Sequence, residues 1–444
     1  MNKITLVLAA ALTLSAPFAA AKVTPEEAAT LGTTLTPVGA EKAGNAAGTI
    51  PAWTPGAQRG KLSGEYPSDP AIDGEKPLFT ITKSNLDKYR ANLDEGHIRL
   101  LQSYDSYKMN VYPSHRNANF PDEILKATVA NATSAEIEGT DTVKGAKLGF
   151  PFPIPKTGAE PIWNHRLKWR GENARRYNNQ MIVQPNGEFS LTKIVEDVKF
   201  YYSSIKTPTP AAPDSIAIKY LSQTVAPPRM AGTFILVHEK TNARDAWLYS
   251  PGLKRIRRAP TVCCDNPYEG TDGHQFYDQV DMFNGTMERY SLKLVGKKEM
   301  YIPYNSNLIA GPKVTFKQMA KPKHLNSDLP RYELHRVWVV EFNIKKGTNH
   351  TFQKRVMYLD EDTWNIVAVE NYDARGQIYQ YQEGHLVFAA SILSSTTVPE
   401  VIYHFTSGRY FVTAMANEDK AVDSTVVFAD SDFDSASVQK RSTR

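Results

Sequence analysis

The stretch RYELHRVWVVEFNI, residues 331–344, decides the fold class, because apolar and polar residues alternate along most of it. One side of the expected strand carries Tyr332, Leu334, Trp338, Val340, Phe342 and Ile344. The other carries Arg331, Glu333, His335, Glu341 and Asn343. This period of two is typical of a strand between an apolar side and a wetter one. Strands usually run about 5 to 6 residues, so one this long predicts a large curved sheet whose concave side can hold an apolar molecule.

The composition is that of a globular protein with a substantial core. The chain has 444 residues, of which 41% are hydrophobic and 22% charged, and its mean hydropathy is −0.42. This length fits one large or two ordinary domains. The formal charge of +5, from 52 basic and 47 acidic residues, does not indicate nucleic-acid binding.

Residues 1–21 have the pattern of a secretory signal peptide. Lys3 precedes a short apolar run, and Ala19 and Ala21 are the small residues expected before a cleavage site. No Cys follows to carry a lipid, so we expect a periplasmic protein cleaved near Ala21, either free or peripheral to the outer membrane.

Three regions are expected after the signal. Residues 22–78 are rich in Gly and Pro and predict an extended arm. Residues 79–444 predict a single domain. Its helical part spans about 83–130, with a helical pattern up to about Met109 and a second helix from Pro121 to about Ala130.

From about residue 163 the pattern changes to strands joined by tight turns. Residues 181–194 predict a hairpin that turns at Pro185, Asn186 and Gly187. Further strands are expected at 233–240, 245–259 and 351–384. Short turns between successive strands predict an antiparallel sheet rather than βαβ units.

The only cysteines are the adjacent Cys263 and Cys264. In an oxidising compartment they can close a strained vicinal disulfide, or they are two ordinary small side chains in a loop. Both interpretations remain open. Adjacent residues cannot supply the spaced ligand pair of a usual metal site, so no metal is expected there.

Several segments together resemble the exported bacterial domain-of-unknown-function 1329 family: WLYSPGLKRIRRAP (247–260), CDNPYEGTDG (264–273), FNGTMERYSLKLVGKKEMYIPYN (283–305), RYELHRVWVVE (331–341) and KRVMYLDEDTWNI (354–366). That family is similar to the outer-membrane lipoprotein-sorting (LolA/LolB-like) fold. The resemblance implies a mainly β protein whose antiparallel sheet forms an open half-barrel, with helices on its concave side.

The resemblance also implies partners and a role. It implies a carrier of lipids, lipoprotein acyl chains or similar molecules that works beside an inner-membrane exporter of the RND/MmpL type and an outer-membrane protein. It supplies no catalytic residues. The outer-membrane receptor of lipoprotein sorting is lipid-anchored, and this chain lacks the Cys for that, so a soluble shuttle fits better.

The candidate ligand-binding residues are apolar side chains on shared strand faces. They are expected to line an apolar cavity, or alternatively to pack against the protein's own helices: Trp247, Tyr249, Leu334, Trp338, Val340, Phe342, Phe352 and Tyr358. Arg255, Arg257 and Arg258 can contact an anion or a partner protein, although alternation splits this cluster between two faces, which favours solvated charge.

Acidic groups are interpreted as loop chemistry. Asp265, Asp272, Asp278 and Asp281 lack the spacing of a calcium loop and predict a surface loop, and Asp360 to Asp362 predict a turn. No nucleophile elbow, zinc-protease or phosphate-loop motif occurs. We therefore expect no enzyme, no cofactor and no metal, with an envelope scaffold or a lipid or glycan hydrolase as the alternatives.

Overall fold

The computed structural model describes residues 22–55 and 67–443. A 15-stranded sheet dominates these residues, in the order β1-β2-β12-β13-β14-β15-β16-β17-β5-β6-β7-β8-β9-β10, with β11 paired to β12. Its pairs are antiparallel apart from the contact of β2 with β12 at Tyr332 and Val111. No pairing joins β10 to the other end of the described sheet, so it is not closed into a barrel. The expected fold class, mainly β with an open curved sheet, is confirmed.

The strands of this sheet are β1 (Phe79–Ile81), β2 (Met109–Val111), β5 (Asn173–Val183), β6 (Phe189–Phe200), β7 (Ile216–Ala226), β8 (Phe234–Lys240), β9 (Arg244–Ser250), β10 (Arg255–Arg258), β11 (Tyr290–Pro303), β12 (Tyr332–Ile344), β13 (Lys354–Asp360), β14 (Ile366–Tyr372), β15 (Ile378–Ala389), β16 (Ser394–His404) and β17 (Arg409–Met415). A separate hairpin pairs β3 (Glu136–Glu138) with β4 (Thr142–Lys144).

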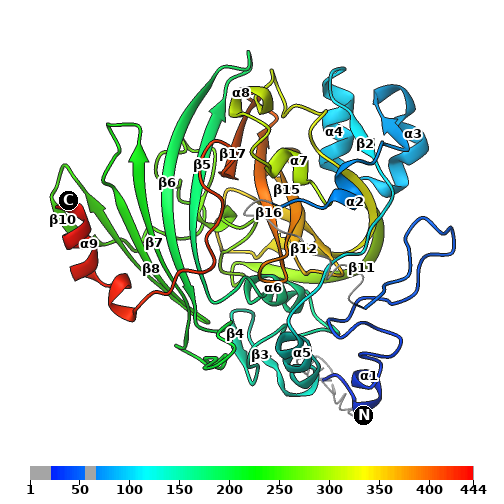
Figure 1. The fold of residues 1–444 in the computed structure, drawn as a ribbon, viewed down its shortest axis with the longest axis horizontal. Coiled ribbons are helices and arrows are strands. Elements are labelled where there is room, and N and C mark those ends of the chain that lie inside the picture. The colour runs from blue at the N-terminus through cyan, green and yellow to red at the C-terminus, as the bar shows by residue number, and fades with distance from the viewer. Residues whose placement is uncertain (1–21, 56–66, 444) are drawn as a thin grey trace, which may run out of the picture.

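The helices are short: α1 (Pro25–Ala28), α2 (Pro70–Asp73), α3 (Leu86–Tyr89), α4 (Glu95–Ser103), α5 (Asp122–Ser134), α6 (Ala159–Arg166), α7 (Asn307–Ala310), α8 (Phe316–Met319) and α9 (Ser435–Ser442). Figure 1 shows β5–β10 on the left, β15–β17 in the centre and the strongly bent β11 and β12 on the right. No helix within residues 22–55 and 67–443 is both long enough and apolar enough to cross a membrane.

The decisive strand, β12, is covered on both faces rather than on one. Val337 and Val339 belong to a core cluster that includes α4, whereas Val340 and Phe342 belong to a second cluster that includes α6. His335, on the side expected to be wetter, is only 1% exposed. The expectation of a wetter side is therefore wrong for this part of the strand, because Tyr304 stacks on His335 and the neighbouring Val337 and Val339 are buried in the cluster that includes α4.

The helical pattern before Met109 is divided by a break at Asp94. The Asp94 carboxylate accepts the backbone N–H of His97 and caps α4. Gly96 then lies against the ring of Tyr381, where a Cβ would come within 2.0 Å of a ring carbon. This close approach to the sheet explains a glycine in the first turn of a helix.

Two other local expectations are confirmed. Helix α5 follows Pro121 and runs to Ser134, four residues beyond the expected end. Strands β5 and β6 form the expected hairpin, with Gly187 at a φ of +90° in the turn.

Candidate functional site

The main cavity lies against β5–β8 and has a volume of about 270 Å³. Helix α6, the loop 262–284 and the end of β15 with the start of β16 supply its other walls. The C-terminal segment reaches it through Val422, whose side chain is 45% exposed, so the cavity meets the surface there. Ligand pockets usually have volumes of roughly 300–1,000 Å³, so this cavity is at the small end of that class.

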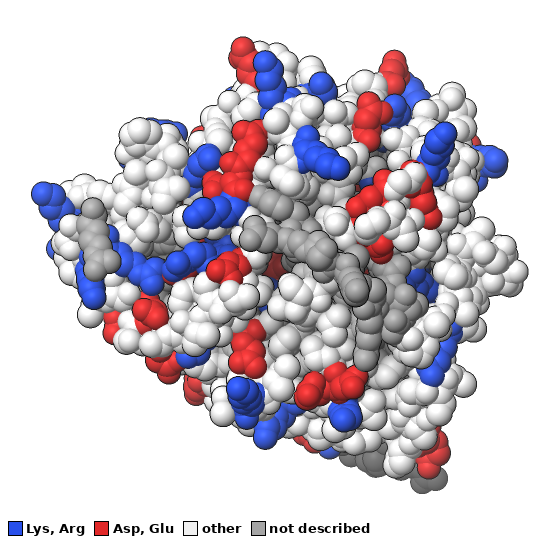
Figure 2. Space-filling view, in the orientation of Figure 1, with Lys and Arg blue, Asp and Glu red and all other residues white. Residues whose placement is uncertain are grey.

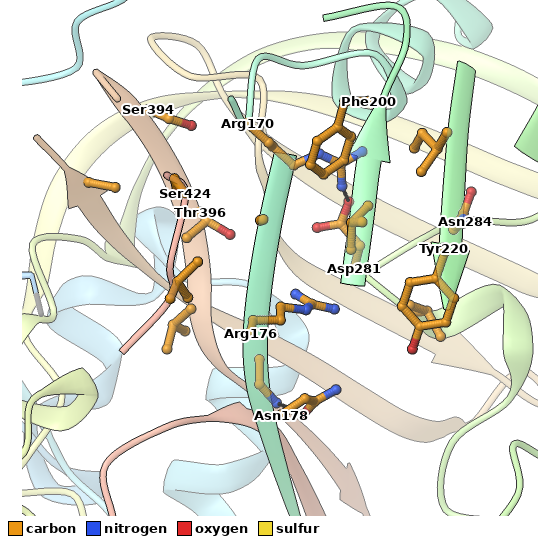
Figure 3. Close-up of a pocket in the computed structure, with 18 of the residues that line it drawn as sticks. Arg170, Arg176, Asn178, Phe200, Tyr220, Asp281, Asn284, Ser394, Thr396 and Ser424 are labelled. Atoms are coloured by element: carbon orange, nitrogen blue, oxygen red, sulfur yellow. Dashed lines mark hydrogen bonds and ion pairs between the residues drawn. The ribbon is translucent and has the colours of Figure 1, made fainter. Parts of the chain in front are cut away.

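Apolar side chains from neighbouring strands form most of the wall. Residues spaced by two on one strand share a face, which places Val198 with Phe200 on β6 and Ile235 with Val237 on β8. Ala174 and Ala217 add small side chains that leave the space open. The result is a chamber whose surface is mostly apolar but whose wall also holds charged side chains, among them Arg170, Arg176 and Asp281 (Figure 3).

A buried carboxylate on β6 is held by side chains that line the cavity. Glu196 is 1% exposed and forms an ion pair with Arg176. Its Oε1 also accepts hydrogen bonds from Asn178 Nδ2 at 2.8 Å and from the Tyr220 hydroxyl at 2.7 Å. Because these partners come from β5 and β7, the carboxylate links three strands and is not free to act as a base.

A second carboxylate, Asp281, lies where α6 meets the cavity. Its Oδ2 contacts Lys168 Nζ at 2.7 Å and Arg170 Nη1 at 2.6 Å, and Figure 3 shows Arg170 beside the ring of Phe200. Burial raises the pKa of Asp281, but Lys168 and Arg170 outweigh it, so the net shift is downward. Burial lowers the pKa of Lys168 to about 8.

A third carboxylate, Glu400, borders a water-sized space of about 20 Å³ that shares Arg176 and Asp281 with the main cavity. Thr397 Oγ1 donates to Glu400 Oε1 at 2.9 Å. Burial, and then repulsion from Asp281, raises the pKa of Glu400 to about 7. The group is therefore partly protonated near neutral pH.

The wall is better suited to binding than to chemistry. The carboxylates that line the cavity, Glu239 and Asp281, are held by cations. Burial lowers the pKa of the nearby His165 to about 3, so this imidazole is neutral. Apolar side chains dominate the remaining surface. Such a chamber can hold an apolar group by excluding water from it.

The eight predicted apolar residues lie elsewhere, and none of them is among the described residues that line the cavity. Val340 and Phe342 pack near α6, and Leu334 and Tyr358 belong to the cluster that includes α4. Their contact with a ligand stays a prediction.

The other four predicted apolar residues are also packed against protein. The ring of Trp338 stacks on that of Trp364 at 6.1 Å between centroids, and the ring of Phe352 lies 5.5 Å from that of Phe276. Trp247 and Tyr249 pack in the cluster of the C-terminal helices. The structure thus distributes the eight among several clusters instead of bringing them together.

The predicted basic contact residues lie on the edge strand β10. Arg255, Arg257 and Arg258 are exposed, and Arg258 forms an ion pair with Asp245. On the face shown in Figure 2, acidic and basic side chains are interspersed over the surface. A partner contact at these arginines stays a prediction.

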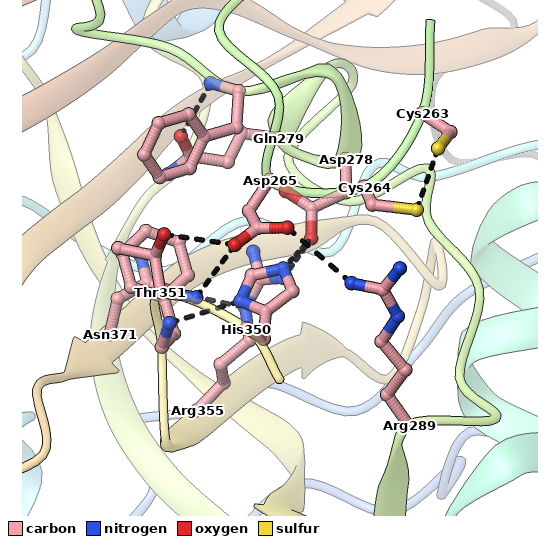
Figure 4. Close-up of polar contacts among 12 residues, drawn as sticks. Cys263, Cys264, Asp265, Asp278, Gln279, Arg289, His350, Thr351, Arg355 and Asn371 are labelled. Carbon is pink, nitrogen blue, oxygen red and sulfur yellow. Dashed lines mark hydrogen bonds and ion pairs between the residues drawn. The ribbon is translucent and has the colours of Figure 1, made fainter. Parts of the chain in front are cut away.

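The two cysteines are free thiols whose Sγ atoms lie 2.8 Å apart (Figure 4). Burial, followed by the hydrogen bond with Cys263, raises the pKa of Cys264 to about 12. A thiol with such a pKa is a poor nucleophile at neutral pH.

The acidic loop is not a surface loop throughout, which corrects the expectation. Asp278 is 3% exposed. Its carboxylate accepts a hydrogen bond from Arg355 Nη1 at 2.7 Å and contacts His350 Nε2 at 2.9 Å (Figure 4). Asp281 belongs to the cavity wall described above. The loop folds back over the sheet, and cationic side chains there allow its carboxylates to be buried.

The sequence analysis did not identify the cavity residues, because apolar and polar residues alternate less regularly along their strands than along β12. The sequence carries one usable signal: Ile194, Glu196, Val198 and Phe200 share a face in which a single carboxylate interrupts apolar residues. A charge at an inward position requires a partner, and Arg176 on the preceding strand of the same hairpin is that partner.

The fold and the cavity together define a class: a mainly β protein in which an open, curved antiparallel sheet holds an apolar chamber. The family model described as "Protein of unknown function (DUF1329)" matches residues 80–439. The chain belongs to this family, and the resemblance found in its motifs is confirmed.

One relative and several solved structures are similar to the chain. An uncharacterized protein of Pseudomonas aeruginosa, PA3922, is 40% identical over 98% of this chain and 97% of its own length. A DUF1329 family protein from Desulfovibrio piger has a TM-score of 0.43 at 14% identity, over 63% of this chain and 97% of that one.

Two other solved structures carry names from lipoprotein sorting. A domain from Vibrio parahaemolyticus, described as an outer-membrane lipoprotein-sorting protein, has a TM-score of 0.43 at 16% identity, over 63% of this chain and 97% of its own. A LolA superfamily protein from Nitrosomonas europaea has a TM-score of 0.38 at 11% identity, over 62% of this chain and 94% of its own.

Proposed function

We propose that this protein binds a hydrophobic molecule in the cavity against β5–β8 and carries it without changing it. The observation that supports this most is the chamber itself: about 270 Å³ with a mainly apolar surface, in which the lining carboxylates Glu239 and Asp281 are already paired. Burying apolar surface gains about 25 cal/mol per Å², so covering about 200 Å² of a ligand is worth roughly 5 kcal/mol. That gain holds an acyl chain or a similar group away from water.

We infer further that the carrier works in the periplasm. The signal-like residues 1–21, which lie outside the described residues, support export. Release requires a partner that offers a more apolar site. The family resemblance suggests an RND/MmpL-type exporter and an outer-membrane protein for the donor and acceptor roles.

The proposal is tested by filling the cavity. Ala174 lines the chamber, and in Ala174→Phe the added ring occupies the ligand's space. The matched control is Ala130→Phe, which places the same ring on the exposed face of α5. Both variants are compared with the wild type for binding of a fluorescent fatty acid and for co-purifying ligand by native mass spectrometry.

We expect Ala174→Phe to weaken binding at least about tenfold, which corresponds to a loss of about 1.4 kcal/mol, while Ala130→Phe binds as the wild type does. Extraction should return the ligand unchanged, whereas a hydrolase would return products. The proposed carrier function is refuted if the wild-type protein binds neither fatty acid nor phospholipid. If the two variants bind the ligand equally well, the ligand does not bind in this cavity.

A further inference from the structure

A compact group of potential ligand atoms lies outside the apolar chamber, where the turn after β13 meets β12. His335, Asp360 and Asp362 each offer one ligand atom, and these atoms lie within 4.8 Å of one another. The three residues are 1%, 0% and 2% exposed. None of them lines the cavity of the proposed carrier. The turn expected at Asp360 to Asp362 is present, but its carboxylates are buried, whereas turn carboxylates normally face water.

The carboxylates in this group have unequal partners. Asp362 is held by Arg116, whose Nε and Nη2 donate at 2.8 and 2.7 Å. Asp360 Oδ2 accepts from Thr363 Oγ1 at 2.7 Å, whereas Asp360 Oδ1 is buried and has no hydrogen-bond partner among the described residues. A fully buried carboxylate oxygen without a partner is costly unless something positive or a donor contacts it.

One ring nitrogen of the histidine is held by a carboxylate. His335 Nε2 lies 3.1 Å from Glu333 Oε2, so Glu333 fixes the ring and leaves Nδ1 available. Metal-binding histidines commonly direct their second nitrogen at a carboxylate in this way, which raises the basicity of the ligating nitrogen. Glu333 is held in turn by Arg331 Nε at 2.6 Å and by Asn305 Nδ2 at 2.9 Å.

Tyr304 supplies an independent observation beside this group. Its ring stacks on His335 with centroids 3.8 Å apart and planes 18° apart. Its hydroxyl is buried and has no hydrogen-bond partner in the part of the chain that the structure describes. Buried tyrosine hydroxyls normally find a partner, and this one belongs to a side chain stacked directly on the candidate ligand.

We propose that His335, Asp360 and Asp362 bind one divalent transition-metal ion of the Zn²⁺ class, with the Tyr304 hydroxyl or a water beside it. One imidazole and two carboxylates suit Zn²⁺ and, less well, Mn²⁺, whereas Ca²⁺ prefers six to eight oxygens. The site departs from the expectation of no metal. It is independent of the proposed carrier function.

The position of this site indicates a structural role. Asp360 and Asp362 flank Glu361, which forms ion pairs with Arg336 of β12 and Lys297 of β11. Two residues after Asp362, Trp364 Nε1 donates to the Val38 carbonyl of the N-terminal arm at 2.9 Å. A cation here would join β12 to the turn after β13, next to contacts that reach β11 and the arm, so binding should stabilise the fold.

The test uses the full mature chain, refolded from urea with a chelator or with Zn²⁺, Mn²⁺ or Ca²⁺. Bound metal is measured by plasma mass spectrometry after dialysis, and Tm by calorimetry. We expect one Zn²⁺ per chain and a Tm higher by about 5 °C or more than with chelator. Mn²⁺ should have a smaller effect and Ca²⁺ none.

Two variants and a control locate the ion. Asp360→Asn keeps an acceptor for Thr363 and should retain less than a tenth of the Zn²⁺, as should His335→Gln. The control His404→Gln changes another buried histidine, which lies outside the group, and should keep the metal. The proposal is overturned if the wild type binds no Zn²⁺ after refolding, or if Asp360→Asn binds as much as the wild type.

Discussion

The two halves of the sheet are covered differently, and the cavity lies over the less covered half. In β13 and β14 the runs Arg355–Asp360 and Ile366–Asn371 are buried without interruption, because core clusters lie on both faces. In β6, by contrast, Phe189–Lys193 are exposed or half-buried. We call β12–β17 the packed half and β5–β10 the open half. One continuous sheet can thus form a packed core in one half and border a cavity in the other half.

The packed half holds a charge network that joins a helix to the sheet. His97 is fully buried, with Asp94 2.6 Å from its Nδ1 and Glu383 2.8 Å from its Nε2. Burial lowers the pKa of His97, but the two carboxylates outweigh it and raise the pKa to about 10. The imidazolium therefore joins α4 to β15. Such a network specifies one arrangement of helix and sheet rather than a binding surface.

Phe342→Ala tests whether the packed half is core. Phe342 is 0% exposed and contacts the rings of Phe283 and Tyr290. Removing a fully buried ring costs about 3–5 kcal/mol in free energy of unfolding, because a void remains. We expect about 4 kcal/mol by urea denaturation, with ligand affinity per folded molecule unchanged. A loss of less than about 1 kcal/mol together with weaker ligand binding would instead place Phe342 in a ligand site.

The sequence predicted the fold class but did not point to the cavity against β5–β8, for one physical reason. Alternation along β12 and tight turns such as that at Gly187 are local signals, and they determine strands and their antiparallel order. Which face of a strand is left uncovered depends on α6 and the loop 262–284, which are far away in the sequence. Trp338 and Phe342 therefore satisfied every local criterion for a cavity residue.

The buried polar groups show the same limit. Asp360 and Asp362 were interpreted as turn chemistry, since their spacing alone does not reveal that His335 lies beside them. Only the register of β12 with β13, in which Val337 pairs with Asp360, brings these residues together. Long-range pairing carries this information, and a single sequence does not contain it in any short pattern.

Glu400→Gln probes the boundary between the halves through pH. The folded pKa of Glu400 is raised to about 7 from 4.5 by burial and Asp281, against the attraction of Arg176 and Lys168. A raised acid pKa means that the folded state binds more protons, so stability is lost as pH rises from about 4.5 to about 7. The variant should be more stable than the wild type at pH 8, by at most about 3 kcal/mol, and equal to it at pH 4.

Urea denaturation between pH 4 and pH 8 measures this difference. Glu188→Gln, on an exposed turn between β5 and β6, is the matched control and should follow the wild type at every pH. Parallel pH profiles for Glu400→Gln and the wild type would contradict the assignment of this carboxylate to a buried, repelled position. A stability difference confined to high pH would mean that the Glu400 carboxyl is protonated in the folded state at lower pH and destabilises the fold only when it ionises.

Phe200→Ala is the counterpart of Phe342→Ala in the open half, and its effect on stability should be the smallest. Phe200 lines a space that already exists, so truncation enlarges a cavity instead of creating one. The ring also loses its contact with the Arg170 guanidinium, whose central carbon lies 4.8 Å from the ring centroid. We expect about 1 kcal/mol by urea denaturation, together with at least about fivefold weaker binding of the fluorescent fatty acid. The two phenylalanines thus separate the roles of the two halves, because one variant should lose stability and the other affinity. If Phe200→Ala cost as much stability as Phe342→Ala and left affinity unchanged, the open half would be a second core and the contrast would fail.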